Sequence, residues 1–206
     1  LIIFFVLAIT LWVHLNNNIN IFLALRLSLF NSISVMTGTG YSTENFSNWG
    51  YFANTMFLIM MLLGGCSGST TGGLKIFRIQ VLWALVIKEL KTINSPRAIS
   101  NINLKNININ ENIINSVMII FFCFIFSVFF IASAFVYYEY DFITSISAAV
   151  TSVSVVGPGI GNIIGPEGSF SQLPDALKLL LSFGMVLGRL EYLAFLIILA
   201  PKFWIK

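Results

Sequence analysis

Two short polar stretches interrupt apolar parts of the chain, and their residue types suit a backbone that coordinates an ion. They consist of Thr37, Gly38, Thr39 and Gly40, and of Ser154, Val155, Val156 and Gly157. Glycine permits dihedral angles that other residues resist, so successive carbonyl oxygens can converge and replace the hydration shell of an ion. We therefore predict that both stretches belong to a selectivity filter. The alternative is two polar breaks in membrane helices that hold no ion.

A third polar stretch, residues 64–73, is too rich in glycine to remain helical. Each glycine in a helix costs ~1 kcal/mol relative to alanine, and irregular backbone at membrane depth needs a cover of protein or a water-filled cavity. The stretch lacks the Gly-Lys-[Ser/Thr] ending of a phosphate-binding loop. Its candidate functional residues are Gly64, Gly65, Ser67, Gly68, Ser69, Thr70, Gly72 and Gly73.

Residue types that catalyse reactions or bind metals are scarce and scattered. His14 is the only histidine, and Cys66 and Cys123 lie in separate apolar contexts. The cysteines therefore predict neither a metal-ligand pair nor a disulfide framework, and the chain offers no set of nucleophile and base. We expect no enzyme activity, no cofactor and no nucleic-acid partner.

The composition indicates a membrane protein with several spans. Of 206 residues, 57% are hydrophobic and only 9% are charged, and the mean hydropathy is +0.91. Soluble proteins carry about 25% charged residues. The chain starts at Leu1 inside an apolar run, so we expect a fragment that lacks its N-terminal part.

The polar stretches lie among apolar segments that predict helices. Residues 21–36 and 142–153 are too short and polar for lipid-facing spans, so we predict re-entrant half-helices that end at the two filter stretches. Residues 113–138 form the clearest full span, since about 20 apolar residues cross a bilayer. The other predicted segments are a helix at 1–13, a span at 52–63 that resumes from 74 to 90, a polar linker at 91–112 and a returning span at 175–204.

Charged residues segregate between the predicted loops. The loops beside the half-helices hold the acids Glu44, Glu139, Asp141, Glu167 and Asp175. On the opposite side, residues 75–105 hold six basic residues and one acid, Glu89: Lys75, Arg78, Lys88, Lys91, Arg97 and Lys105. Lys202 and Lys206 close the chain on the same side. Because basic residues concentrate on the cytoplasmic side of membranes, we predict a multi-pass plasma-membrane protein with a cytoplasmic linker (91–112) and C-terminus.

The two halves of the chain repeat one order of elements. Gly40 and Gly157 are 117 positions apart, and beyond the filter a separation of 124 matches Gly64 with Gly188. Both units enter from the same side, as in a parallel repeat. The predicted fold is an all-α membrane protein of tandem units, each a span, a re-entrant half-helix, a filter loop and a span, as in potassium channels. The predicted domains are 1–92, the linker 93–112 and 113–206.

The motifs resemble the TrkH branch of the TrkH/KtrB superfamily of potassium-translocating membrane subunits. The resemblance covers nearly the whole chain and rests on five motifs, at 36–43, 64–75, 157–161, 185–191 and 201–204. It implies that the chain holds the third and fourth of four pore repeats and that potassium is the permeant ion. It also implies a homodimer of complete subunits in membrane lipid and a TrkA-like, nucleotide-binding cytoplasmic regulatory subunit. Gly38 departs from the family, where threonine is more typical at this position.

The same resemblance implies that residues 64–73 form a gate below the filter, closed at rest; the alternative is a purely structural kink. In the repeat alignment Arg189 lies opposite Gly65, where the second span of the first unit breaks. A charged side chain at this depth in the membrane is expected to face the pore or a partner. We predict that Arg189 donates hydrogen bonds to carbonyl oxygens of 64–73 and repels cations there. The alternative is an ion pair with Glu191, which would require a bend, because residues two apart do not share a helix face.

A second function class stays open at this point. A secondary transporter could hold an organic or anionic substrate between broken helices, but it would direct half-helix N-termini at that substrate. Here the half-helices direct their partly negative C-terminal ends inward, which favours a cation. Lys75 and Arg78 could line a cytoplasmic vestibule or anchor the chain at the membrane surface, and the basic linker could bind a regulatory protein or lipid.

Overall fold

A computed structural model of the chain is mostly helical. It describes residues 1–66, 68–69, 71–94, 103–104, 107–199 and 204. In chain order the elements are α1 (Ile2–Asn17), α2 (Ile21–Thr37), η1 (Phe46–Trp49), α3 (Tyr51–Leu62), β1 (Leu63–Gly64), β2 (Leu74–Lys75), α4 (Ile76–Asn94), β3 (Asn103–Leu104), β4 (Ile107–Asn108), α5 (Glu111–Tyr137), α6 (Phe142–Ser154), η2 (Phe170–Gln172), α7 (Asp175–Arg189) and α8 (Leu193–Leu199).

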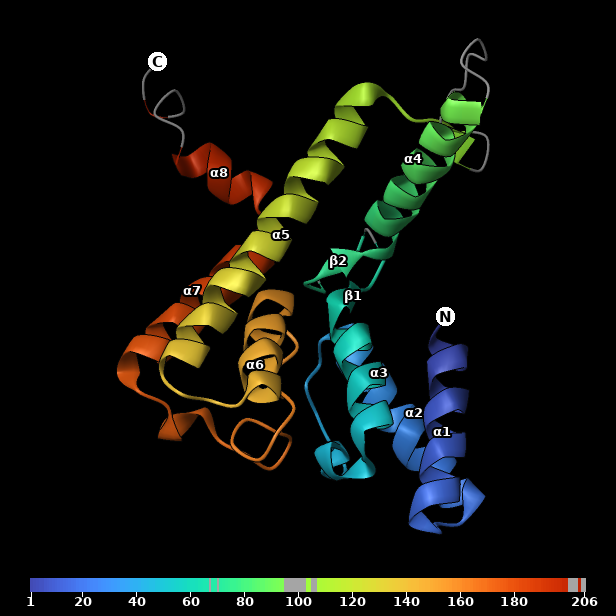
Figure 1. The fold of residues 1–206 in the computed structure, drawn as a ribbon, viewed down its shortest axis with the longest axis vertical. Helices are drawn as coiled ribbons and strands as arrows, with labels where there is room; N and C mark the ends of the chain where they lie inside the picture. Colours follow the sequence, from blue (N-terminus) through green and yellow to red (C-terminus); the bar gives the residue numbers. More distant parts are fainter. Residues whose placement is uncertain (67, 70, 95–102, 105–106, 200–203, 205–206) are drawn as a thin grey trace.

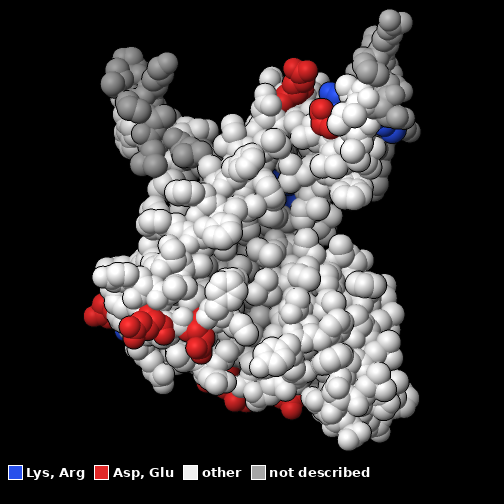
Figure 2. All heavy atoms as spheres, in the orientation of Figure 1, with Lys and Arg blue, Asp and Glu red and all other residues white. Residues whose placement is uncertain are grey.

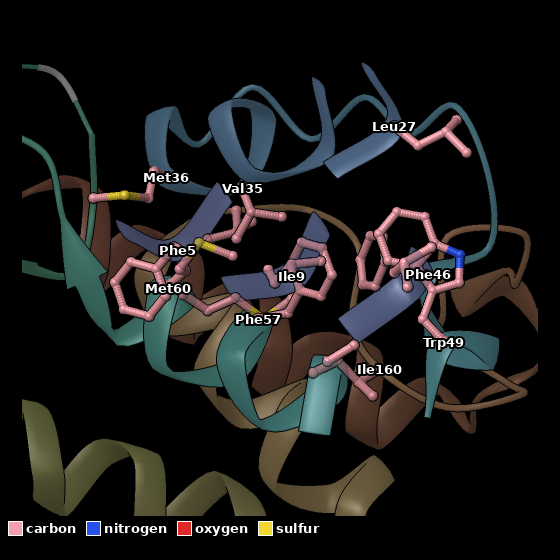
Figure 3. Packing of buried hydrophobic residues seen from close by; sticks show 14 of the residues in the cluster. Phe5, Ile9, Leu27, Val35, Met36, Phe46, Trp49, Phe57, Met60 and Ile160 are labelled. Atoms are coloured by element: carbon pink, nitrogen blue, oxygen red, sulfur yellow. The ribbon is translucent and has the colours of Figure 1, made fainter. Parts of the chain in front are cut away.

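The first half of the chain packs α1, α2 and α3 around one apolar core (Figure 1). Phe46 of η1 stacks on Phe57 of α3 with ring centroids 4.3 Å apart. The indole nitrogen of Trp12 donates a hydrogen bond to the carbonyl oxygen of Trp49 at 2.8 Å. Figure 3 shows Phe46, Trp49 and Phe57 together with Ile160, which follows α6 in the second half. Trp12 belongs to α1 and Phe57 to α3, so the segment after the first filter stretch is fixed against both of these helices.

The second half has its own core, built around the short helix α6. This helix packs against α5 and α7, and ten of its 13 residues are buried. The buried hydroxyl groups of Ser147 and Ser152 donate hydrogen bonds to carbonyl oxygens one turn earlier, at 3.2 and 2.8 Å. Since these bonds satisfy the hydroxyl groups, a polar sequence is accommodated inside the protein.

The two halves meet along α6. Val150, Val156 and Ile160 from the second half belong to the core of the first, and α3 contacts α6 directly. In the other direction, Leu74 of β2 is buried in the core of the second half. The contact brings the ends of α2 and α6 together, which is the arrangement that positions the filter stretches.

The outer surface of α5 is apolar, as a membrane span requires. Among the described residues, α5 is the one helix long and apolar enough to cross a bilayer. Its side chains Phe122, Phe126, Phe129 and Phe130 are 57–72% exposed. Figure 2 shows a broad uncharged surface between two charged ends. Acidic side chains lie along the edge where α5 leads into α6 and α6 into α7, and acidic and basic side chains both lie at the opposite end, near α4 and the start of α5.

The helix boundaries agree with the sequence at the filter stretches, and within two residues for α3 and α5, but they differ for α4 and for the segment after Pro174. α2 ends at Thr37 and α6 at Ser154, each within one residue of the predicted end. α4 begins only at Ile76 and extends to Asn94, into the stretch that we assigned to the polar linker. The segment 175–204, expected to return across the membrane as one span, is interrupted between α7 and α8. Glu191 in this interruption has a left-handed φ of 51°, which a right-handed helix cannot contain.

Candidate functional site

α2 ends in a left-handed turn that leads directly into the first filter stretch. Gly38 has a φ of 68°. Its amide donates to the carbonyl oxygen of Val35 at 3.2 Å, and the amide of Thr39 donates to that of Ser34 at 3.0 Å. This pair of hydrogen bonds satisfies carbonyl groups that the end of a helix leaves unpaired.

α6 ends in the same way at the second filter stretch. Val155 has a φ of 55°, its amide donates to Ser152 at 3.2 Å, and the amide of Val156 donates to Thr151 at 3.1 Å. Every donor and acceptor lies 117 positions after its counterpart at α2. A β-branched residue is rare in the left-handed region, so its neighbours must hold this turn in place.

The two filter stretches face each other at Gly40 and Gly157. Both glycines have positive φ angles, of 79° and 114°. A Cβ atom on Gly40 would lie 2.6 Å from the carbonyl oxygen of Val156, and one on Gly157 would lie 3.5 Å from Cα of Gly40. The backbone of each stretch therefore occupies the space that a side chain on the other would need.

Carbonyl oxygens of the filter stretches are left without protein partners. Within the described part of the chain, no hydrogen bond ends on the carbonyl oxygens of residues 38–40 or 155–157. The oxygens of Val155 and Val156 face the other stretch, beside Gly38 and Gly40. Carbonyl groups inside proteins are normally paired, so these oxygens are available to a ligand that accepts their electron pairs, such as a cation.

Two hydroxyl groups of α6 fix the second filter stretch. Thr151 accepts a hydrogen bond from the amide of Gly157 at 3.1 Å and donates one to the carbonyl oxygen of Pro158 at 3.0 Å. Ser147 accepts one from the amide of Ile160 at 3.1 Å and donates one to its carbonyl oxygen at 2.8 Å. These roles were not predicted from the sequence, although serine and threonine in a helix between apolar segments were a signal for them.

Asn31 of α2 fixes the first filter stretch through Thr43. Its side-chain nitrogen donates to the hydroxyl of Thr43 at 3.1 Å, and its oxygen accepts from the amide of Thr43 at 3.2 Å. From the sequence, residues 21–36 were predicted only to be too polar for a lipid-facing span, with no role for Asn31. The hydroxyl groups of Thr37 and Thr39 are 2.6 Å apart on the exposed side of the stretch.

The glycine-rich stretch forms a loop against the C-terminal ends of α2 and α6. It is closed by the parallel pairing of β1 with β2, in which Gly64 lies opposite Lys75. A Cβ atom on Gly72 would clash with the carbonyl oxygen of Ser154, and one on Gly38 would lie 3.4 Å from the methyl group of Thr71. The predicted gating residues Ser67 and Thr70 lie outside the described residues.

The other predicted gating residues of the loop are packed unequally. A Cβ atom on Gly64 would clash with the carbonyl oxygen of Gly72, and Gly73 has a φ of 77°. A Cβ atom on Gly65 would lie 2.8 Å from the hydroxyl of Thr71, whereas one on Gly68 would meet nothing within 4 Å. The base of the loop therefore requires glycine, and its tip at Gly68 does not.

A cavity of about 630 Å³ lies beside the loop, next to the first filter stretch. Its wall is formed by the start of α1, the end of α2 and the loop itself, including Ile2, Met36, Thr37, Gly65, Ser69 and Thr71. The hydroxyl groups of Ser69 and Thr71 lie 2.5 Å apart at this wall. The cavity therefore adjoins both the end of α2, where the first filter stretch begins, and the glycine-rich loop.

α7 approaches the loop through Val155. A Cβ atom on Gly188 would lie 3.1 Å from a methyl group of Val155, and one on Gly72 would lie 3.2 Å from the same methyl. Arg189 follows Gly188, ends α7 and has an exposed side chain. The predicted hydrogen bonds from Arg189 to the loop remain a prediction.

Glu191 connects the interruption after α7 with the exit of the loop. Its carboxylate forms ion pairs with the ammonium group of Lys75 and, at 2.6 Å, with the guanidinium group of Arg78. The sequence analysis considered Arg189 as a partner of Glu191 and left Lys75 and Arg78 without one. The separations of 116 and 113 positions gave no local signal for these pairs.

Comparisons with known proteins agree with this geometry. The family model of TrkH, described as a cation transport protein, matches residues 2–205. The chain is 39% identical over 204 residues to the Trk system potassium uptake protein TrkI of Halomonas elongata, and the aligned region covers 99% of this chain and 41% of that protein. It is 30% identical over 198 residues to TrkH of Escherichia coli, covering 95% of this chain and 40% of that protein.

A solved structure has the same fold. The crystal structure of the potassium transporter TrkH from Vibrio parahaemolyticus matches 98% of this chain with a TM-score of 0.86 and 27% sequence identity. The match covers 43% of that chain, so this chain spans about two fifths of the length of its relatives. From the matched family model, which covers nearly every residue, the chain belongs to the TrkH family of cation transport proteins.

Proposed function

We propose that this chain is part of the ion-conducting membrane subunit of a potassium uptake system. The proposal rests on family membership and on relatives whose names describe potassium uptake proteins. The observation that carries it is the meeting of Gly40 and Gly157, which brings to one place carbonyl oxygens of two helix ends that accept no hydrogen bond from the described residues. Carbonyl oxygens and the negative ends of helix dipoles both stabilise a cation.

The eight filter residues, 37–40 and 154–157, would form two quarters of a selectivity filter. The matched hydrogen bonds at the ends of α2 and α6 support a tandem repeat with an offset of 117. The units would be 1–92 and 113–206, joined by the linker 93–112. A length of about two fifths of the relatives is consistent with two of four repeats, and the resemblance of the motifs implies that they are the third and fourth.

The proposed subunit is multi-pass in the plasma membrane. The acidic loops would face outward, and the linker 91–112 and the C-terminus would face the cytoplasm, because basic residues favour the cytoplasmic side. The exposed phenylalanine side chains of α5 support contact with lipid. The complete subunit would form a homodimer and bind a nucleotide-binding cytoplasmic regulatory subunit, as the family resemblance implies.

The glycine-rich loop, 64–73, would be the gate, and Arg189 would hold it closed. The position of the loop against the ends of both filter helices supports this role. The shared contact of Gly72 and Gly188 with Val155 brings the residue before Arg189 to the loop. In the closed state a guanidinium group there would also repel cations.

The test is growth at low potassium of a bacterium that lacks its own potassium uptake, with the full-length gene supplied in trans. We expect rescue by the wild-type gene and by Thr55→Ala, whose exposed hydroxyl only bonds the preceding turn. Gly157→Ala should abolish rescue, because φ at this position is 114°. Absence of rescue by a wild-type protein that is present in the membrane would contradict the proposal, as would rescue by Gly157→Ala.

A further inference from the structure

The ion pairs of Glu191 join two segments that both adjoin the proposed gate. Lys75 is the last residue of β2, directly after the glycine-rich loop, and Arg78 lies in the first turn of α4. Glu191 lies in the interruption between α7 and α8, two residues after Arg189. One carboxylate group therefore ties the exit of the loop in the first half to the broken helix in the second half.

We propose that Glu191 is a positioning residue that restrains the loop in its closed arrangement through Lys75 and Arg78. This inference rests on the proposed function, since it assigns a regulatory role to the same gate. Glu191 does not contact the filter. Its effect would pass through β2, whose pairing with β1 closes the base of the loop.

The burial of the three side chains fits a restraint that can be released. The side chains of Lys75 and Arg78 are only 9% and 13% exposed, whereas that of Glu191 is 45% exposed. Buried cations need a nearby anion, so loss of the carboxylate disfavours their present positions strongly. The exposed carboxylate adjoins a cavity of about 360 Å³ between α4 and α5, where water can solvate it after release.

The strand pairing at the exit of the loop is short, and one described position inside the loop is loosely packed. β1 and β2 pair over only two residues each, and a Cβ atom at Gly68 would meet nothing within 4 Å. Glu191 itself has a φ of 51°, which a non-glycine residue adopts only where its surroundings favour it. The ion pairs thus stabilise the bend after α7 and the exit of the loop at the same time.

The experiment measures rubidium uptake into proteoliposomes that contain the full-length protein without its regulatory subunit. Glu191→Gln should raise this unstimulated uptake roughly 5-fold or more, the lower end of typical coupling between sites. Glu191→Asp, which keeps the charge, should stay close to wild type. Asp175→Asn is the matched control, because it removes the partner of Lys178 in an exposed ion pair away from the loop.

Two further measurements separate a lost restraint from a damaged fold. The charge exchange Lys75→Glu with Glu191→Lys should return uptake toward wild type, whereas Lys75→Glu alone should not. Cys66 is an exposed thiol inside the loop, so its rate of alkylation, followed by peptide mass spectrometry, should rise in Glu191→Gln. Cys123 on α5 provides the reference rate.

The outcomes also separate this inference from the proposed function. Wild-type protein without rubidium uptake would contradict the proposed function. Wild-type uptake that Gly157→Ala abolishes, together with unchanged uptake and unchanged Cys66 alkylation in Glu191→Gln, would overturn the role of Glu191 alone. Raised uptake in Glu191→Gln that the charge exchange fails to lower would likewise reject the ion pairs as its cause.

Discussion

Gly38 and Val155 adopt the same left-handed backbone at the ends of α2 and α6, although only one of them is a glycine. This conformation costs a non-glycine residue about 1–2 kcal/mol, so contacts must hold Val155. Its methyl group lies beside Gly72 of the loop and Gly188 of α7. Val155 therefore packs the second filter stretch, the loop and α7 together, whereas Gly38 needs no such contacts.

The first prediction separates backbone strain from blockage within the first filter stretch. Gly40→Ala should abolish potassium flux, because its Cβ atom would lie 2.6 Å from the carbonyl oxygen of Val156. Gly38→Ala should retain measurable flux and lose about 1–2 kcal/mol of stability, since its Cβ atom would lie no closer than 3.3 Å to its neighbours. Flux in proteoliposomes and thermal unfolding in detergent measure the two effects; equal flux in both variants would contradict the prediction.

The second prediction concerns the hydroxyl group of Thr151. Thr151→Val keeps the shape of the side chain but leaves the amide of Gly157 and the carbonyl oxygen of Pro158 unpaired. Each lost hydrogen bond costs about 0.5–1.5 kcal/mol, so the filter should lose its fixed geometry and discriminate less between potassium and sodium. The measurement is the ratio of potassium to sodium flux. Ser152→Ala is the control, because its hydroxyl bonds only Ala149 within α6; an equal loss of selectivity there would argue against the role of Thr151.

The ends of the two filter helices were predictable because their signals are local. A glycine after Thr37 and the sequence Gly157-Pro158-Gly159 shortly after Ser154 both indicate that a helix has ended. The repeat also aligned Gly64 with Gly188, and both glycines lie where a backbone carbonyl group leaves no room for Cβ. Patterns of a few residues therefore predicted the helix ends, whereas the close backbone contacts of the two aligned glycines are known only from the structure.

The ion pairs of Glu191 were not predictable in the same way. Lys75 and Arg78 lie in the other half of the chain, and only the folded contact between the halves brings them to Glu191. The sequence did indicate that an acid two residues after Arg189 needs a bend or another partner. The structure has both, since the chain turns at Glu191 and the carboxylate reaches the loop exit.

The third prediction tests the close packing of α7 on α6. A Cβ atom on Gly188 would clash with the carbonyl oxygen of Val153, so Gly188→Ala should lower the stability by about 1–3 kcal/mol, the usual cost of overpacking. Gly68→Ala is the matched control for stability, because its Cβ atom would meet nothing within 4 Å. Thermal unfolding in detergent is the measurement. Equal melting temperatures for the two variants would show that α7 can move away from α6 at no cost.

The last prediction concerns Arg189 and its relation to Glu191. Arg189→Ala should raise unstimulated potassium flux, because it removes both a hydrogen-bond donor and a positive charge beside the proposed gate. Arg189→Lys should raise it less, since lysine keeps the charge but lacks the planar fork of donors. Unchanged flux in Arg189→Ala would contradict a gating role for this residue.

Combining Arg189→Ala with Glu191→Gln then decides whether the two residues act on one element. Arg189 would act on the loop directly, and Glu191 would act on its exit through Lys75 and Arg78. If both restrain the same closed loop, the double variant should raise flux less than the product of the two single effects, because residues in one network are not additive. A product of the single effects would instead indicate two independent restraints, with Glu191 acting on α8 or α4 apart from the loop.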